Sequence, residues 1–341
     1  MKVCALQNEK FAICIIRLLL ISCWLDSTGA SRRNLLIVSD FGENSDMKQK
    51  SEDIEQLLQL IKAWLMKQPH LPQNIEDQLL RRFIISAFHS VEKTKALIDL
   101  NYTLRSQAPE IFDNRDPDLH EIQNVFNLVD FCPLPKLTEK KHKLFIYRLA
   151  DSDPDRFAYA DVLKAFFMVA DYRMSFDREM SDGEVPIFDM NNTTLRHITK
   201  VTLPLVKKYM VYTQEAHPVR LRQIHVLNTT PLLDKCMAIV RPFLKSEVAK
   251  LLIFHAPNSS TLFDYISPEL IPKEYGGTLN VTMESIKEEW RLKVQRHRSF
   301  YLDDTRWRLD ENRRPSENCN AGGGGGNLFG MQGSFRSLSI D

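Results

Sequence analysis

Four short apolar runs alternate with helix-like segments between residues 143 and 255, and this alternation restricts the fold more than any other feature. The runs read KLFIYRL, VPIFDM, IHVLN and LLIFH, which have the length and the apolar composition of strands. Two of the intervening segments are FAYADVLKAFFMVADYRMSF and LRHITKVTLPLVKKYMVYTQEA, with apolar residues at helical spacing. The pattern predicts an α/β domain with a mainly parallel sheet flanked by helices.

The chain before this domain has the periodicity of short amphipathic helices. Apolar residues recur at helical spacing from about Ser51, and a break at Pro69 to Pro72 precedes a second stretch, Leu79 to Phe88. A third stretch, VEKTKALIDLNYTLRSQAPEIF, stops near Pro109. The sequence therefore predicts a small helical domain in front of the α/β domain.

Composition limits the possible partners. The 341 residues suffice for roughly two domains. With 45 Lys and Arg against 44 Asp and Glu, the net charge is +1, so we expect no nucleic-acid partner. The 6 cysteines show no CxxC or metal-finger spacing, which favours reduced thiols.

The N-terminal region allows two interpretations. The apolar run Phe11 to Leu25 follows Lys2 and Lys10 and precedes small residues, as in a signal peptide. However, Arg17 interrupts the run, which is also shorter than the roughly 20 residues of a membrane-spanning helix. We expect a cytoplasmic protein, and a secreted one if the run is a signal peptide.

The common catalytic signatures are missing from the sequence. There is no dinucleotide fingerprint, Walker loop, HExxH or GxSxG. His225 in IHVLN is a candidate base, but a lone strand histidine is more often a hydrogen-bonded core residue. Asp189 in IFDM fits a turn cap better than a catalytic acid. We therefore predict no catalytic residues, no cofactor, no metal and no enzymatic activity.

Three motifs in succession carry a resemblance to a known family. PVRLRQIHVLNTT is followed by an apolar stretch ending in RPFL and then by ELIPKEYGGT. The helical part contains LLRRFIISAFHSVEKTK, where the family pattern is LLRFLRARKFDVEKA. Over about Ser51 to Thr278 the chain resembles the CRAL-TRIO lipid-binding family.

The resemblance implies a domain order. Residues 1–45 would form an N-terminal extension with the apolar segment, and residues 46–118 a three-helix unit. Residues 119–279 would form the lipid-binding domain with a gate helix. Residues 280–341 would contain one more helix and a disordered tail around AGGGGGN.

In this family the sheet is the floor of a closed apolar pocket, and a mobile gate helix covers it. The pocket residues expected here are Phe166, Phe167, Phe188, Met190, Leu227, Leu233, Met237 and Val240. The gate maps onto Pro231 to Lys245. Its remaining apolar residues are Leu232, Cys236, Ile239, Phe243 and Leu244. An ordinary filled core and a helix buried on two sides fit the same composition.

The resemblance also suggests a basic cleft for a phosphoinositide headgroup. Arg220 and Arg222 match two of its positions and would point to one face of a strand. The chain departs from the family at Glu247 and Leu251, where basic residues are usual, and has IISAF in place of LRARK. The candidate headgroup residues are Arg220, Arg222, Lys245 and Lys250. A solvated sheet edge explains the two arginines equally well.

The function implied is non-enzymatic binding of a small hydrophobic lipid, such as a retinoid or tocopherol, and its transfer between membranes. The alternative is a phosphoinositide-responsive lipid sensor or store without transfer activity, and the third class is an enzyme that acts on the lipid. The expected partners are a hydrophobic ligand and, transiently, a membrane surface with or without phosphoinositide. We expect a monomer that is peripheral at membranes.

Overall fold

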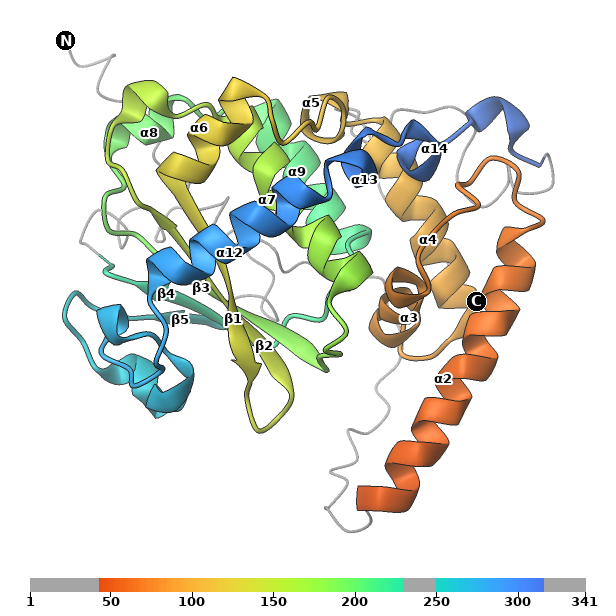
Figure 1. Cartoon of the computed structure of the whole chain (residues 1–341), viewed down its shortest axis with the longest axis horizontal. Coiled ribbons are helices and arrows are strands. Elements are labelled where there is room, and N and C mark those ends of the chain that lie inside the picture. Colours follow the sequence, from red (N-terminus) through yellow and green to blue (C-terminus); the bar gives the residue numbers. More distant parts are fainter. Residues whose placement is uncertain (1–42, 230–249, 316–341) are drawn as a thin grey trace.

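The computed structural model describes residues 43–229 and 250–315 (Figure 1). The apolar run Phe11 to Leu25 and the expected gate helix lie outside these residues. No helix in the described ranges is long and apolar enough to cross a membrane.

The first described region is helical and has a core of its own. Its main helices are α2 (Glu43–Leu65), α3 (Asp77–Ser86) and α4 (Val91–Ser106). Leu58 and Ile61 of α2 pack with Phe83 of α3 and Ile98 of α4, and all four are buried. The turn between α3 and α4 places Phe88 and His89 at positive φ, 56° and 61°.

The second region is built on a five-stranded sheet in the order β1-β2-β3-β4-β5. The strands are β1 (Val129–Leu137), β2 (His142–Leu149), β3 (Gly183–Asp189), β4 (Ile224–Leu227) and β5 (Leu252–Phe254). β1 is antiparallel to β2, and the other neighbours are parallel. The mainly parallel sheet flanked by helices and preceded by a helical region confirms the predicted fold class.

One strand was missed by the sequence analysis. β1 contains Pro133 and Pro135, and prolines lower the strand signal because they cannot donate a backbone hydrogen bond. The strand is tolerated because β1 lies at the edge of the sheet, where only one side of its backbone pairs.

Helices surround the sheet and connect its strands (Figure 1). Besides α2 to α4, the described α-helices are α5 (Pro109–Phe112), α6 (His120–Leu128), α7 (Tyr159–Phe176), α8 (Leu195–Thr199), α9 (Leu203–Glu215), α12 (Met283–Arg296), α13 (Arg298–Leu302) and α14 (Asp304–Trp307), of which α7, α8 and α9 connect strands. The stretch 195–216 is divided into α8 and α9, with Pro204 in the first turn of α9. Proline is favoured there because the first turn needs no amide donor.

Side chains alternate between two faces of the sheet. One face, here the α7 face, carries Phe131, Tyr147 and Phe188 and contacts Phe166 of α7. The opposite face, the α12 face, carries residues such as Cys132, whose thiol lies 3.7 Å from the Met283 carbonyl of α12.

Polar side chains on the α12 face form a hydrogen-bond network at the carboxyl end of β3. The Tyr275 hydroxyl donates to Asp189 at 2.9 Å, and the Asn228 amide donates to the same carboxylate at 2.6 Å. Asp189 also caps its own turn by accepting from the Asn191 amide. The turn-capping role predicted for Asp189 is therefore confirmed.

The two glycines of the YGGT motif have different reasons to be glycine. Gly276 has φ +80°, a left-handed conformation that L side chains avoid. A Cβ at Gly277 would lie 1.9 Å from the Ile271 carbonyl oxygen, so the chain could not pass there with any side chain.

A buried charge cluster joins the helical region to the sheet region. Asp171 of α7 forms ion pairs with both Arg105 of α4 and Arg115, and all three side chains are at most 7% exposed. Arg105 and Asn101 also donate to the Tyr212 hydroxyl of α9, each at 2.9 Å.

Residues 297–315, which we call the C-terminal strap, run back over the helical region. Arg314 pairs with Asp99 of α4 at 2.7 Å, and Arg306 pairs with Glu76. The Asp310 amide donates to the His70 carbonyl at 2.9 Å. The strap therefore fastens the helical region from outside, while the Asp171 cluster holds it from inside.

Asp171→Asn should destabilise the protein strongly, because it leaves two buried guanidiniums facing each other without a counterion. We expect a loss of about 3–5 kcal/mol in the free energy of unfolding, measured by urea denaturation. Asp155→Asn, which removes an exposed partner of Arg196, is the matched control and should leave the urea midpoint unchanged. Equal midpoints for the two variants would contradict the assigned role.

The His225 and His255 rings form a buried pair on the α12 face, with Nδ1 of His225 2.9 Å from Nε2 of His255. This confirms His225 as a hydrogen-bonded core histidine. Burial, and secondarily the neighbouring His255, lowers the pKa of His225 from 6.5 to about 3.

Between pH 6.5 and 3 the unfolded chain therefore binds a proton at His225, whereas the folded chain does not. The free energy of unfolding should fall as the pH drops through this range. In His225→Gln this fall should be shallower, by up to about 1.4 kcal/mol per pH unit. The measurement is urea unfolding at several pH values. His120 is exposed, and His120→Gln serves as the control. If the free energy of unfolding changed with pH to the same extent in the native chain, His225→Gln and His120→Gln, His225 would not cause the pH dependence.

Candidate ligand-binding face of the sheet

A row of aromatic side chains crosses the α7 face. Tyr147 on β2 pairs with Phe131 on β1 and with Phe188 on β3, so the three rings point the same way. The Tyr147 ring centroid lies 6.3 Å from that of Phe131 and 5.2 Å from that of Phe188. Val226 on β4 and Phe254 on β5 continue the row. The centre of this face is therefore apolar and uncharged.

Part of this face is not fully covered by protein atoms. Phe131 and Phe188 are 4% and 5% exposed, whereas Tyr147 and Phe166 are only half-buried. Burial nevertheless raises the pKa of the Tyr147 hydroxyl well above its usual range. The Tyr147 side chain is thus enclosed by the protein but keeps part of its surface accessible. The α7 face is therefore the candidate ligand site.

The structure brings some of the expected pocket residues together and separates others. Phe166 and Phe188 both contact Tyr147, with ring centroids within 5.5 Å, and Met190 follows directly after β3. Phe167 lies between helices instead, where its ring centroid is 4.9 Å from that of Phe112. Leu227 alternates with Val226 and so belongs to the α12 face.

The remaining pocket residues expected from the sequence, Leu233, Met237 and Val240, lie outside the described residues. So does the whole expected gate, Pro231 to Lys245, with Leu232, Cys236, Ile239, Phe243 and Leu244.

Phe131 and Tyr147, which are central to the aromatic row, were not among the pocket residues predicted from the sequence. A usable signal exists for Tyr147, because Phe145 and Tyr147 are two residues apart in KLFIYRL and must share a face of a strand. Phe131 had no such signal, since its strand was hidden by Pro133 and Pro135.

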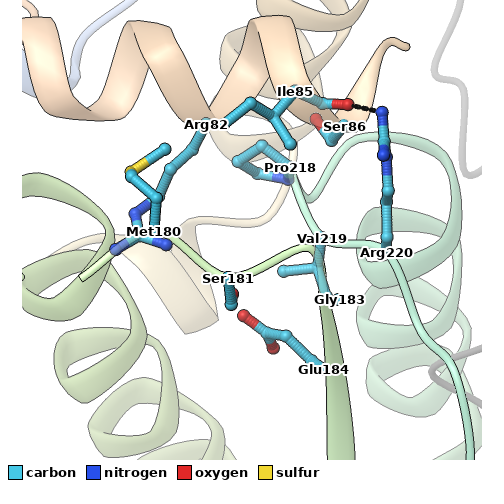
Figure 2. A pocket seen from close by; sticks show the side chains of 10 residues that line it. All are labelled: Arg82, Ile85, Ser86, Met180, Ser181, Gly183, Glu184, Pro218, Val219 and Arg220. Carbon is cyan, nitrogen blue, oxygen red and sulfur yellow. Dashed lines mark hydrogen bonds between the residues drawn. The ribbon is translucent and has the colours of Figure 1, made fainter. Parts of the chain in front are cut away.

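Two of the expected headgroup residues, Arg220 and Arg222, lie near the start of β3, and Figure 2 shows Arg220 beside the helical region. The Arg220 guanidinium donates to the Ile85 carbonyl and lies 4.0 Å from the centroid of the Phe88 ring. Burial lowers the pKa of Arg220. Arg222 donates to the Asp182 carbonyl at 2.8 Å. The described contacts of both arginines are thus within the protein.

The hollow beside Arg220 is small. Its volume is about 20 Å³, which suits one water molecule and not an inositol phosphate. Of the other candidate headgroup residues, Lys250 is exposed just before β5, and Lys245 lies outside the described residues.

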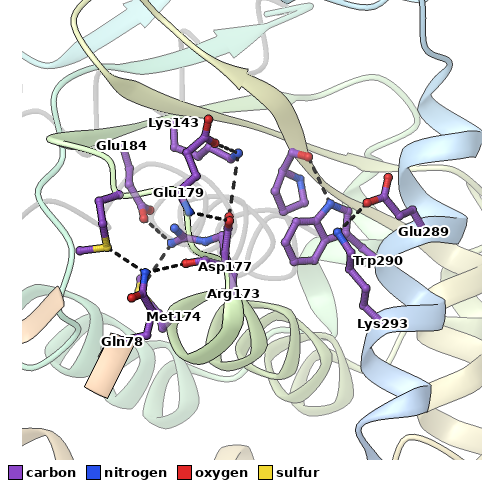
Figure 3. Close-up of polar contacts among 12 residues, drawn as sticks. Gln78, Lys143, Arg173, Met174, Asp177, Glu179, Glu184, Glu289, Trp290 and Lys293 are labelled. Atoms are coloured by element: carbon purple, nitrogen blue, oxygen red, sulfur yellow. Dashed lines mark hydrogen bonds and ion pairs between the residues drawn. The ribbon is translucent and has the colours of Figure 1, made fainter. Parts of the chain in front are cut away.

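A larger groove of about 520 Å³ lies at the edge of the sheet, between β1, the end of α7 and α12. Aromatic side chains of Tyr172, Phe176 and Trp290 line it together with charged residues. Figure 3 shows how two of its lysines are engaged: Lys143 pairs with Glu179 at 2.6 Å and Lys293 with Glu289 at 2.5 Å.

The described residues also bear on metal chemistry. Within residues 43–229 and 250–315, no group of three or more His, Cys, Asp or Glu side chains is arranged to hold a metal ion.

Comparison with known proteins follows the same division of the chain. Residues 50–122 match the Pinta-like UBA domain, and residues 130–277 match the CRAL/TRIO domain. The crystal structure of Sfh5 aligns with a TM-score of 0.45 and 13% sequence identity, over 76% of this chain and 99% of that one.

Curated relatives are similar over a comparable length. The alpha-tocopherol transfer protein-like protein of Mus musculus is 22% identical over 226 residues, which cover 66% of this chain and 64% of that protein. Clavesin-2 of Rattus norvegicus is 24% identical over 241 residues, covering 69% and 72%. The match thus spans less than two thirds of the first relative's length. The match over residues 130–277 shows that this chain contains a CRAL/TRIO domain, in agreement with the mainly parallel sheet and its helical cover.

Proposed function

We propose that the chain binds one small hydrophobic lipid against the α7 face and transfers it between membranes without chemical change. The observation that carries this proposal is the aromatic row through Tyr147, which is desolvated yet incompletely covered. Similarity to a protein named for alpha-tocopherol transfer supports the same direction. A retinoid, a tocopherol or a similar isoprenoid is the class of ligand proposed.

The physical basis of binding is removal of apolar surface from water. Each 100 Å² of buried ligand surface contributes roughly 2.5 kcal/mol, so an uncharged lipid binds tightly without ion pairs. A mostly apolar site with few polar groups is the usual form of a small-molecule pocket. The α7 face has this composition, because the row contains a single polar atom, the Tyr147 hydroxyl oxygen.

Release requires that the cover of the site opens. We assign this role to residues 231–245, whose two apolar stripes suit one face for the ligand and one for a bilayer. The protein would then act as a monomer in the cytoplasm and touch membranes transiently.

The phosphoinositide-responsive store or sensor is the second candidate. It has the weaker support, because Arg220 and Arg222 donate to backbone carbonyls of the protein and the hollow beside Arg220 is small. Of the described candidates, Arg222 and Lys250 are exposed, and Arg222 is already bonded to the Asp182 carbonyl.

The binding proposal is tested by organic extraction of the purified protein followed by mass spectrometry, and by uptake of fluorescent retinoid or tocopherol. We expect one lipid per protein. Phe166→Trp should reduce uptake at least about tenfold, because the larger ring would occupy part of the proposed binding face beside Tyr147. Leu60→Trp on the exposed surface of α2 is the control and should bind normally. A chain that carries no lipid and takes up none would exclude the proposed function.

The transfer proposal is tested with vesicles. Phe243→Asp should slow transfer of bound ligand between vesicles by about tenfold or more, because a carboxylate opposes insertion of the gate into a bilayer. Equilibrium binding should change little. Equal transfer rates for this variant and the native chain would refute the gate role and leave the storage function.

A further inference from the structure

The Tyr147 hydroxyl is an uncommon group for the centre of an apolar face. Its ring is surrounded by the aromatic rings of Phe131, Phe145, Phe166 and Phe188, at centroid distances of 5.2 to 6.3 Å. Among the described residues its hydroxyl has no hydrogen-bond partner. Buried polar groups normally have one, and an unpaired hydroxyl in a desolvated place is unfavourable.

A buried tyrosine of the same region shows the usual arrangement. The Tyr212 hydroxyl accepts hydrogen bonds from Asn101 and Arg105, each at 2.9 Å, so its desolvation is compensated within the protein. The Tyr147 hydroxyl differs from it, because its side chain is only half-buried and it has no hydrogen-bond partner among the described residues.

The charged side chains of the described strands on this face do not favour a ligand with a phosphate or a carboxylate. On the α7 side of β2 to β5 the charged side chains are Lys143 and Glu184, both near the strand starts. Lys143 pairs with Glu179, and Glu184 pairs with Arg173 of α7 (Figure 3). With both charges neutralised by neighbours, these strands offer no free cation to a phosphate or a carboxylate.

We propose that Tyr147 is a specificity-determining residue: its hydroxyl forms a hydrogen bond with the single polar group of an otherwise apolar, uncharged lipid. This inference rests on the proposed function and narrows its ligand class. An isoprenoid alcohol or phenol meets the requirement, because its hydroxyl pairs with Tyr147 while the rest of the molecule lies on aromatic rings. A phospholipid does not meet the requirement, because its phosphate would lose water without gaining a free cation from strands β2 to β5.

The test compares retinol with its deoxy analogue, which lacks only the hydroxyl, by retinoid fluorescence. The native chain should prefer retinol. Tyr147→Phe should weaken retinol binding about five- to tenfold and leave binding of the deoxy analogue unchanged. Tyr212→Phe is the matched control: it removes a buried tyrosine hydroxyl outside the aromatic row and should leave the ratio of the two affinities as in the native chain. Phosphatidylinositol should not displace retinol from the native chain.

Three results would overturn the inference and leave lipid binding itself intact. They are an equal effect of Tyr147→Phe on both retinoids, no effect on either, or displacement of retinol by phosphatidylinositol. If the native chain took up neither retinoid but carried an extractable lipid without a hydroxyl group, Tyr147 would likewise lose its assigned role. Absence of any extractable or absorbed lipid would instead remove the proposed function.

Discussion

The alternation of side chains along the parallel strands is the constraint on which the rest of the molecule depends. It sends Tyr147 and Phe188 to one side of the sheet, and Asp189 and His225 to the other. On the polar side, Asp189 accepts from Tyr275 and the His225 and His255 rings bond to each other. Because these polar groups have partners on that side, the centre of the opposite side can remain apolar. A shift of one residue in register would exchange the two environments and destroy both.

Much of the fold could be predicted because it is encoded locally. The runs that form β2 to β5 are apolar and continuous, as buried parallel strands require, and the roles of Asp189 and His225 followed from their local context. β1 could not be found in this way. Its prolines are compatible with a strand only at a sheet edge, and edge position is a property of the assembled sheet.

The candidate site was less predictable than the fold, because it is made by residues far apart in the sequence. Phe166 and Phe188 meet only through Tyr147, whereas Phe167, the neighbour of Phe166, turns away towards Phe112. Helical periodicity shows that residues 166 and 167 differ in direction, but not which of them faces the sheet. The contacts of Arg220 could not be predicted for the same reason. Its hydrogen bond to Ile85 and its contact with the Phe88 ring depend on how the helical region packs against the sheet region.

The C-terminal strap has a consequence for synthesis on the ribosome. Asp99 is separated from Arg314 by 215 residues, so the helical region emerges long before the groups that fasten it. Its own core is local and can condense early, whereas its external fastening must wait until translation is nearly complete. The nascent chain therefore passes through a stage in which the helical region is already compact but is not yet held by the ion pairs of the C-terminal strap.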